Sequence, residues 1–281
     1  MPVRAAAVAG SWYPVNATVL ASDVDGYVTA AQVPPLSGIR ALIAPHAGLM
    51  FSGPVAAYSY KAVAQQQVDV LFLVGPSHFV GFEGVSIWPD GAFDSPLGAV
   101  QVDEAAAHDL LKTAVIQNFA EAHGREHSLE MQLPFIRRLL PDVRIVPMLM
   151  GYQDRDTIEA LADALTSVAA SRRALLVAST DLSHYMDADT AASLDRRVQA
   201  CVDPFDPDAL LDLFEQYPEH DRGRYVACGG GPAIAVMKAA QRLGAQHGRV
   251  LRYAHSGEVS GDYSGVVGYL AAAFGRFGDA Q

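Results

Sequence analysis

Ile39 to Ser52 spell I-R-A-L-I-A-P-H-A-G-L-M-F-S, an apolar run that ends at Pro45 and presents His46 before Gly48. Four to six aliphatic residues without polar alternation are typical of a strand buried on both faces in a parallel sheet. Proline interrupts such a strand because it has no backbone N–H to donate to a neighbour. The stretch therefore predicts a buried strand, about Ile39 to Ala44, with a histidine just beyond its carboxyl end.

A second stretch repeats this arrangement further along the chain. Val70 to Val74 spell V-L-F-L-V and lead into G-P-S-H, which ends at His78. Open α/β sheets bind their ligands beyond the carboxyl ends of the strands. Two histidines placed after two similar strands therefore predict a shared site for His46 and His78.

The rest of the chain alternates between apolar runs and helical patterns. Further strands are predicted at about Val85–Ile87, Arg144–Met150, Ala174–Ala178, Val250–Ala254 and Val266–Phe274. Helices are predicted at about Ala17–Ala31, from Gly53-Pro54 through Val63, Glu104–Thr113, Leu129–Leu140, Asp156–Ala170, Asp187–Ala200, Pro207–Phe214 and Ala233–Arg242. Asn16, Asp103 and Ser128 are the expected N-caps of three of these helices.

This alternation predicts one α/β domain over residues 1–281, because no linker or low-complexity segment divides the chain. The expected architecture is a mostly parallel, twisted central sheet flanked by helices. The two C-terminal strands could pair antiparallel at one edge of this sheet.

Composition excludes several classes of protein. The chain has 281 residues, is 51% hydrophobic and carries a formal net charge of −11, so a nucleic-acid partner is not expected. No apolar segment approaches the length of a membrane span or a signal-peptide core, so we expect no membrane association. The two cysteines, Cys201 and Cys228, form no disulfide framework. A soluble protein of the reducing cytoplasm is the expectation.

Six residues stand out as candidates for chemistry, and each also has an ordinary structural explanation: His46, His78, His127, Asp181, His184 and Cys228. A single histidine after a strand is most often a hydrogen-bonded structural residue. Four histidines beside turn residues are harder to explain in that way. The other five histidines are expected to lie at the surface or to support the site.

Asp181 and His184 follow the strand that ends in S-T-D-L-S-H. If this turn is helical, both side chains lie on one face, and the carboxylate can orient the imidazole and fix its tautomer. The alternative is that Asp181 is an N-cap and His184 lies in the first turn of a helix.

Cys228 precedes Gly229 to Gly231 and a predicted helix. A buried thiol that packs as a small hydrophobic group is the common case, and we expect it for Cys201. At the start of a helix, however, the dipole favours a thiolate, which can react or bind a metal. The three glycines could instead hold an anion at the helix N-terminus.

Several motifs occur in order along nearly the whole chain. They are A-V-A-G-S-W-Y-P (Ala7–Pro14), A-P-H-A-G (Ala44–Gly48), G-P-S-H (Gly75–His78), E-H-S-L-E-M-Q-L-P (Glu126–Pro134), S-T-D-L-S-H (Ser179–His184), the Cys228 segment and S-G-D-Y-S-G-V-V-G-Y (Ser260–Tyr269). Together these motifs resemble those of the Memo family. The resemblance implies a fold similar to that of class III non-haem iron extradiol dioxygenases.

The resemblance also implies a metal site in a cleft. His46 and His78 would correspond to the two histidine ligands, and Cys228 would replace the carboxylate ligand of the dioxygenases. His127, Asp181 and His184 would line the same cleft, where we expect them to act in catalysis. Trp12 and Tyr13 either line this cleft as well or form an apolar wedge beneath the N-terminal segment.

The resemblance leaves three functions open. The protein could be a redox or oxygen-using metalloenzyme, with an extradiol-type iron dioxygenase as one alternative. It could instead store or deliver a metal, or bind a peptide or partner protein through a vestigial cleft. Fe(II) or Cu is the expected metal, with Zn as a further possibility, because thiolate is a softer ligand than carboxylate. The ligand would be a small molecule or a peptide. The family resemblance also implies a radical-SAM protein as a partner in a shared modification pathway.

Overall fold

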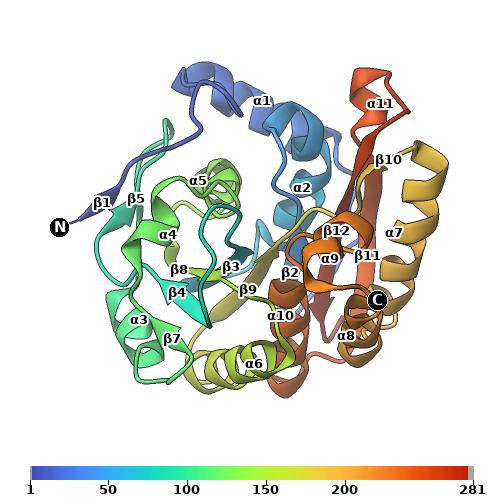
Figure 1. Cartoon of the computed structure of the whole chain (residues 1–281). Helices are drawn as coiled ribbons and strands as arrows, with labels where there is room; N and C mark the ends of the chain where they lie inside the picture. The colour runs from blue at the N-terminus through green and yellow to red at the C-terminus, as the bar shows by residue number, and fades with distance from the viewer. Residues whose placement is uncertain (1, 278–281) are drawn as a thin grey trace.

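A computed structural model describes residues 2–277, and its central feature is a nine-stranded mixed sheet (Figure 1). The strand order is β10-β12-β2-β9-β3-β8-β4-β7, and β11 also pairs with β12. The bounds in this order are His184–Met186, Val266–Gly275, Ile39–Ala44, Ala174–Ser179, Val70–Pro76, Arg144–Met150, Val85–Ile87 and Ile116–Gln117, with β11 at His247–His255. The four central strands β2, β9, β3 and β8 are parallel, as the apolar runs predicted.

Helices cover both faces of the sheet (Figure 1). One layer contains α1 (Ala17–Ala30), α2 (Leu49–Val63) and α5 (Leu133–Leu139). The other contains α3 (Glu104–Leu110), α6 (Arg155–Ala169), α8 (Pro207–Glu215) and α10 (Gly230–Arg242). Helix α7 (Ala188–Val202) packs against β11 and β12. The shorter helices are α4 (Ala120–Gly124), α9 (Glu219–Tyr225) and α11 (Gly257–Ser260).

Burial on both faces explains why the central strands lack polar alternation. In β3, Val70, Phe72 and Val74 pack on the α6–α10 side, whereas Leu71 and Leu73 pack on the α1–α2 side. All five are at most 1% exposed. A strand in this environment can only be apolar on both faces, so its ends are the positions where polar side chains are found.

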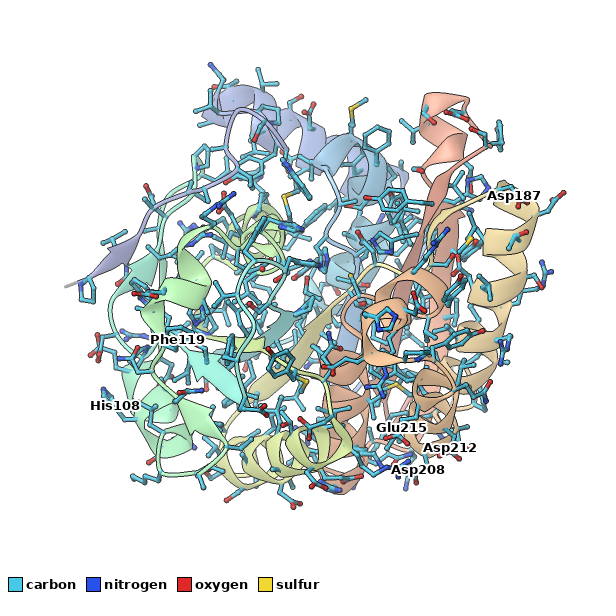
Figure 2. The ribbon with its side chains drawn as sticks, viewed as in Figure 1. His108, Phe119, Asp187, Asp208, Asp212 and Glu215 are labelled. Carbon is cyan, nitrogen blue, oxygen red and sulfur yellow. The ribbon has the colours of Figure 1, made fainter. Side chains whose placement is uncertain are left out.

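Most predicted bounds are confirmed to within a few residues. β2 and β8 have the predicted limits, and the Asn16 and Asp103 side chains accept hydrogen bonds from the first turns of α1 and α3. Asp187 likewise caps α7, accepting from the Thr190 N–H at 3.0 Å (Figure 2). The C-terminal strands β11 and β12 are antiparallel, but β12 also pairs with β2, so β12 is an interior strand of the sheet.

The predicted start of α2 is wrong. The helix begins at Leu49, so Gly53 and Pro54 lie inside it. A Cβ atom at Gly53 would lie 2.9 Å from the Tyr27 ring, which indicates that this glycine allows α1 and α2 to approach closely. Glycine can mark the start of a helix or allow two helices to pack closely. The local sequence does not distinguish these two roles, because the second depends on a distant residue.

The predicted N-cap at Ser128 is also wrong. Its hydroxyl donates to the Pro76 carbonyl at the end of β3, at 3.0 Å. The segment that follows begins as a 3₁₀ turn, Glu130–Gln132, before α5 starts at Leu133. Elsewhere α3 ends at Leu110 rather than Thr113, and α10 starts three residues early, at Gly230.

Glu130 anchors the N-terminal segment to this 3₁₀ turn. Its carboxylate forms a buried ion pair with Arg4 and accepts hydrogen bonds from the Ala7 and Val8 N–H groups at 2.8 and 3.0 Å. The Tyr13 hydroxyl donates to it at 2.5 Å. Arg4 lies in β1 (Val3–Arg4), which joins β5 (Ala92–Phe93) and β6 (Val100–Gln101) in a small separate sheet. Glu130 thus fixes the segment that carries Trp12.

No helix within residues 2–277 is both long enough and apolar enough to cross a membrane.

Replacing Glu130 should therefore destabilise the protein strongly. Glu130→Ala leaves the Arg4 guanidinium buried without its carboxylate, which typically costs about 3–5 kcal/mol of unfolding free energy. Urea denaturation of the purified variant measures this loss. Asp25→Ala is the control, because Asp25 forms an exposed ion pair with Arg138 that should contribute less than about 1 kcal/mol. Equal losses in the two variants would contradict the assigned role of Glu130.

Candidate metal site

Three loops at one edge of the sheet bring together the predicted site residues. His46 follows β2, Asp181 follows β9 and His78 follows β3, and these are neighbouring parallel strands. The imidazole centroids of His46 and His78 are 5.2 Å apart. The sequence-based expectation of one shared edge for these three residues agrees with this placement.

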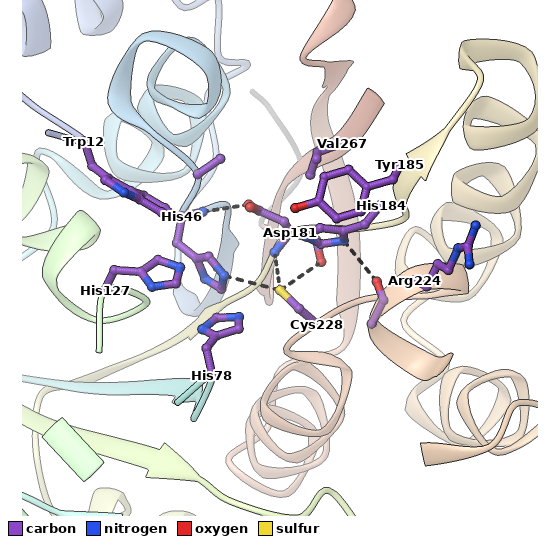
Figure 3. A pocket seen from close by; sticks show the side chains of 12 residues that line it. Trp12, His46, His78, His127, Asp181, His184, Tyr185, Arg224, Cys228 and Val267 are labelled. Carbon is purple, nitrogen blue, oxygen red and sulfur yellow. Dashed lines mark hydrogen bonds between the residues drawn. The ribbon is translucent and has the colours of Figure 1, made fainter. Parts of the chain in front are cut away.

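Cys228 approaches the same point from the start of α10 (Figure 3). Its Sγ lies 3.3 Å from Nε2 of His46, and potential ligand atoms of Cys228, His46 and His78 all lie within 4.8 Å of one another. The main chain of Asp181 fixes the cysteine, since its N–H points at Sγ at 3.4 Å and its carbonyl accepts from the Cys228 N–H at 3.2 Å. A Cβ atom at Gly229 would lie 2.6 Å from the Ser179 carbonyl, so only glycine allows this approach.

His46 is 1% exposed, and both its backbone and its ring are held by hydrogen bonds. Its backbone N–H donates to the Asp181 carboxyl at 2.8 Å, and its ring Nδ1 lies 3.0 Å from the Ser179 hydroxyl. Burial lowers the pKa of His46 well below its ordinary value, and the neighbouring His78 lowers it further. His46 is consequently a neutral imidazole at physiological pH, which is the form that binds metals.

His78 is oriented by Glu126, a residue that the sequence did not single out. Nδ1 of His78 lies 2.9 Å from one carboxylate oxygen, and its backbone N–H donates to the other at 2.6 Å. Burial lowers the pKa of His78, but hydrogen bonds to Cys228 and Glu126 outweigh it and raise this pKa to about 10. Burial opposes ionisation of Glu126, yet His78 lowers the pKa of that carboxyl to about 2. The metal-free site therefore contains an imidazolium between a carboxylate and the cysteine.

The predicted pairing of Asp181 with His184 is not observed. Residues 180–183 are not helical and His184 begins β10, so Asp181 neither shares a helix face with His184 nor caps a helix. The two side chains have different partners. The Asp181 carboxyl accepts from the His46 backbone N–H. Nδ1 of His184 instead donates to the carbonyls of Leu182 and Gly223, at 2.7 and 3.0 Å. Burial raises the pKa of Asp181 to about 7.

His127 completes the wall of the site through ring contacts. It stacks on His78 with centroids 4.5 Å apart and lies 4.2 Å from the Trp12 ring. Trp12 thus lines the cleft, which was one of the two alternatives for this pair. Tyr13 is instead buried beside Glu130 beneath the N-terminal segment, which was the other. Burial lowers the pKa of His127 to about 4, and His78 lowers it as well.

All six candidate residues line one pocket of about 420 Å³ (Figure 3). Trp12, Tyr185, Arg224 and Val267 are among its other lining residues. Tyr185 has φ of +61°, an unusual conformation for a residue with a bulky side chain, and its side chain is 73% exposed. Such a pocket is large enough for a small molecule or for one side chain of a peptide.

The chemistry of the donor set fits a metal ion. Two imidazoles and one thiol converge, and Glu126 holds the second ring nitrogen of His78 as carboxylates commonly do for metal-binding histidines. Three protein ligands facing a pocket leave coordination positions for water or a ligand, which is typical of catalytic rather than structural sites. A second group, formed by His78, Glu126 and His127, is less suitable because Glu126 already accepts several hydrogen bonds.

Comparisons with known proteins support the resemblance found in the sequence. A family model described as Memo-like protein matches residues 4–273. A MEMO1 family protein of Methanopyrus kandleri is 36% identical over 287 aligned residues, covering 97% of this chain and 99% of the relative. One from Nitrosopumilus maritimus is 33% identical, with the same coverage. An uncharacterized protein of Escherichia coli K12 has a similar fold, with a TM-score of 0.55, 14% identity, and coverage of 84% of this chain and 100% of that one.

The role of Glu126 can be measured in the metal-free protein. Glu126→Gln removes the charge that helps to keep His78 protonated, so the pKa of His78 should fall from about 10 toward its ordinary value. NMR titration of the ring resonances follows this change. Glu121→Gln, at an exposed carboxylate in neighbouring α4, is the control and should leave the titration unchanged. An unaltered His78 titration in Glu126→Gln would show that Glu126 does not hold the imidazolium.

Proposed function

Because the chain belongs to the Memo-like family, we propose that it is a metalloprotein that binds one ion through His46, His78 and Cys228. The observation that carries the proposal is the approach of these three side chains, with ligand atoms within 4.8 Å, beside an open pocket. We further propose that this pocket holds a small-molecule or peptide ligand beside the ion that His46, His78 and Cys228 would bind. A redox metalloenzyme is the function that this arrangement supports best.

The donor set favours particular metals. Thiolate is softer than carboxylate, so Cys228 shifts the preference toward Cu or Zn without excluding Fe(II). When bound, Fe(II) or Cu would supply redox chemistry, whereas Zn²⁺ would supply Lewis acidity alone.

The other pocket residues would handle the ligand and its protons. His184 donates through Nδ1 to two carbonyls, so its Nε2 is left as an acceptor on the pocket wall. Asp181, with a pKa of about 7, can hold a proton on its carboxyl near neutral pH. His127 and Trp12 present ring faces to a ligand. We therefore propose His127, Asp181 and His184 as groups that bind the ligand and exchange protons with it.

The family resemblance adds a proposed partner, a radical-SAM protein acting in the same modification pathway. Copurification of the two proteins from cells that contain both would test this proposal.

Metal titration of purified variants tests the ligand assignment. Cys228→Ser should weaken Cu or Zn binding by more than about 100-fold, because a hydroxyl is a harder and far less acidic ligand than a thiol. This loss exceeds the one expected when a group that only orients a ligand is removed. Cys228→Glu should shift the preference toward Fe(II), because it restores two histidines and a carboxylate. Truncation of His127 or His184 to alanine should reduce affinity less, since both belong to the pocket wall.

Cys201→Ser is the matched control for these titrations. Cys201 lies in α7, where its thiol donates to the Arg197 carbonyl at 3.4 Å, so its loss should leave metal affinity unchanged. If Cys228→Ser binds Cu, Zn and Fe as the wild type does, Cys228 is not a ligand and the proposed site is wrong.

We predict that the protein does not cleave simple catechols at an appreciable rate. The reason is that the family resemblance implies Cys228 in place of the carboxylate that an extradiol site uses for Fe(II). Oxygen uptake with Fe(II) and either catechol or protocatechuate measures this activity. Steady uptake that disappears in His46→Ala would overturn the prediction and make a dioxygenase the better proposal.

A further inference from the structure

A chain of buried polar side chains lies behind His46, on the side away from the pocket. Tyr60 of α2, Gln132 of the 3₁₀ turn and Ser179 at the end of β9 are all fully buried. The Tyr60 hydroxyl donates to Oε1 of Gln132 at 2.9 Å, and Nε2 of Gln132 lies 2.8 Å from the Ser179 hydroxyl. Ser179 in turn lies 3.0 Å from Nδ1 of His46.

The amide orientation of Gln132 follows from its neighbours. One end of the amide lies 3.0 Å from the Pro45 carbonyl, which can only accept a hydrogen bond. That end must be the NH₂ group, and the same nitrogen also faces the Ser179 hydroxyl. Gln132 therefore donates to Ser179, and its carbonyl oxygen is left to accept from Tyr60.

The direction of the Ser179 hydroxyl follows next. Its oxygen accepts from Gln132, and it has one hydrogen to donate. The Ser128 carbonyl lies 2.6 Å away and is an acceptor only, and no other donor to this carbonyl is found in residues 2–277. Directing the hydrogen to His46 instead would leave that carbonyl buried and unpaired, which is unfavourable.

We propose that Gln132 and Ser179 are positioning residues that hold His46 in the tautomer with its proton on Nδ1. With the Ser179 hydrogen directed to Ser128, the serine oxygen can only accept from the imidazole, so Nδ1 of His46 is the donor. Nε2 then keeps its lone pair, and this is the atom that lies 3.3 Å from Cys228 Sγ. In the other tautomer, a hydrogen on Nε2 would point at the sulfur and occupy the position that a metal needs.

This tautomer would matter for function because a metal binds only an unprotonated ring nitrogen. That consequence rests on the proposed function, whereas the tautomer itself does not. For His78, the Glu126 carboxylate accepts a hydrogen bond from Nδ1 in the same way. The His46 ring is instead held by the neutral side chains of Ser179 and Gln132.

NMR of the metal-free protein tests the proposal. Long-range proton–nitrogen correlations of the imidazole ring distinguish the two tautomers, and the wild type should show His46 with its proton on Nδ1. Ser179→Ala removes the hydroxyl that lies 3.0 Å from Nδ1, so the proton should move to Nε2, where Cys228 Sγ can accept it. Ser179→Thr retains the hydroxyl and should restore the wild-type pattern. A wild-type His46 protonated on Nε2 would overturn the proposal without any variant.

Ser59→Ala is the matched control. Ser59 is also a fully buried serine, and its hydroxyl donates to the Ile43 carbonyl of β2 at 2.6 Å without contacting His46. This variant should lose a comparable hydrogen bond and leave the tautomer unchanged. An Nδ1 proton that persists in a folded Ser179→Ala, or one that is lost in Ser59→Ala, would show that the chain of polar groups does not set the tautomer.

Zn²⁺ titration separates this proposal from the proposed function. Ser179→Ala should lower Zn²⁺ affinity by about 10- to 100-fold relative to the wild type and Ser59→Ala, as is usual for loss of a group that orients a metal ligand. If the tautomer changes as expected but the wild type does not bind Zn²⁺, Cu or Fe(II), the metal function fails and the positioning role stands. If the wild type binds Zn²⁺ but its His46 is protonated on Nε2, the metal function stands and the positioning role fails.

Discussion

The parallel pairing of β9 with β2 on one side and β3 on the other sets the geometry of this protein. Adjacent strands lie about 4.8 Å apart, so the loops after β2 and β3 begin about 10 Å apart with the β9 loop between them. Side chains of ordinary length from the two outer loops can meet over that middle loop. The middle loop supplies hydrogen bonds instead: Asp181 holds the His46 backbone and the cysteine, while Ser179 contacts the His46 ring.

Burial around this edge creates a second level of organisation, in which charges are placed in pairs. Two carboxylates in the short stretch that leads into α5 form these pairs. Glu126 faces His78, and Glu130 faces Arg4 and the Tyr13 hydroxyl. One carboxylate orients a candidate ligand, and the other fastens the N-terminal segment so that Trp12 reaches His127. The stretch from Glu126 to Gln132 therefore joins the start of the chain to the pocket.

Much of this architecture could be predicted from the sequence because the signals are local. The apolar runs of β2 and β8, the caps Asn16 and Asp103, and the histidines after two strands depend on nearby residues alone. Four features depend on distant ones. Gly53 accommodates Tyr27, Ser128 bonds to Pro76, Glu126 faces His78, and Asp181 turns to His46 rather than to His184. A polar cluster was visible at Glu126-His127-Ser128, but no local pattern specifies its partner across the fold.

Cys228 differs from the two histidines in where it comes from. His46 and His78 extend from the edge of the sheet, whereas Cys228 is supplied by the start of α10 and held there through main-chain atoms of Asp181. Its position in the site therefore depends on the contact between the start of α10 and the loop after β9. Residue 228 thus supplies a donor to the site without being part of any strand of the sheet. In the proposed site, the donor that sets the metal preference therefore lies outside the sheet that sets the fold.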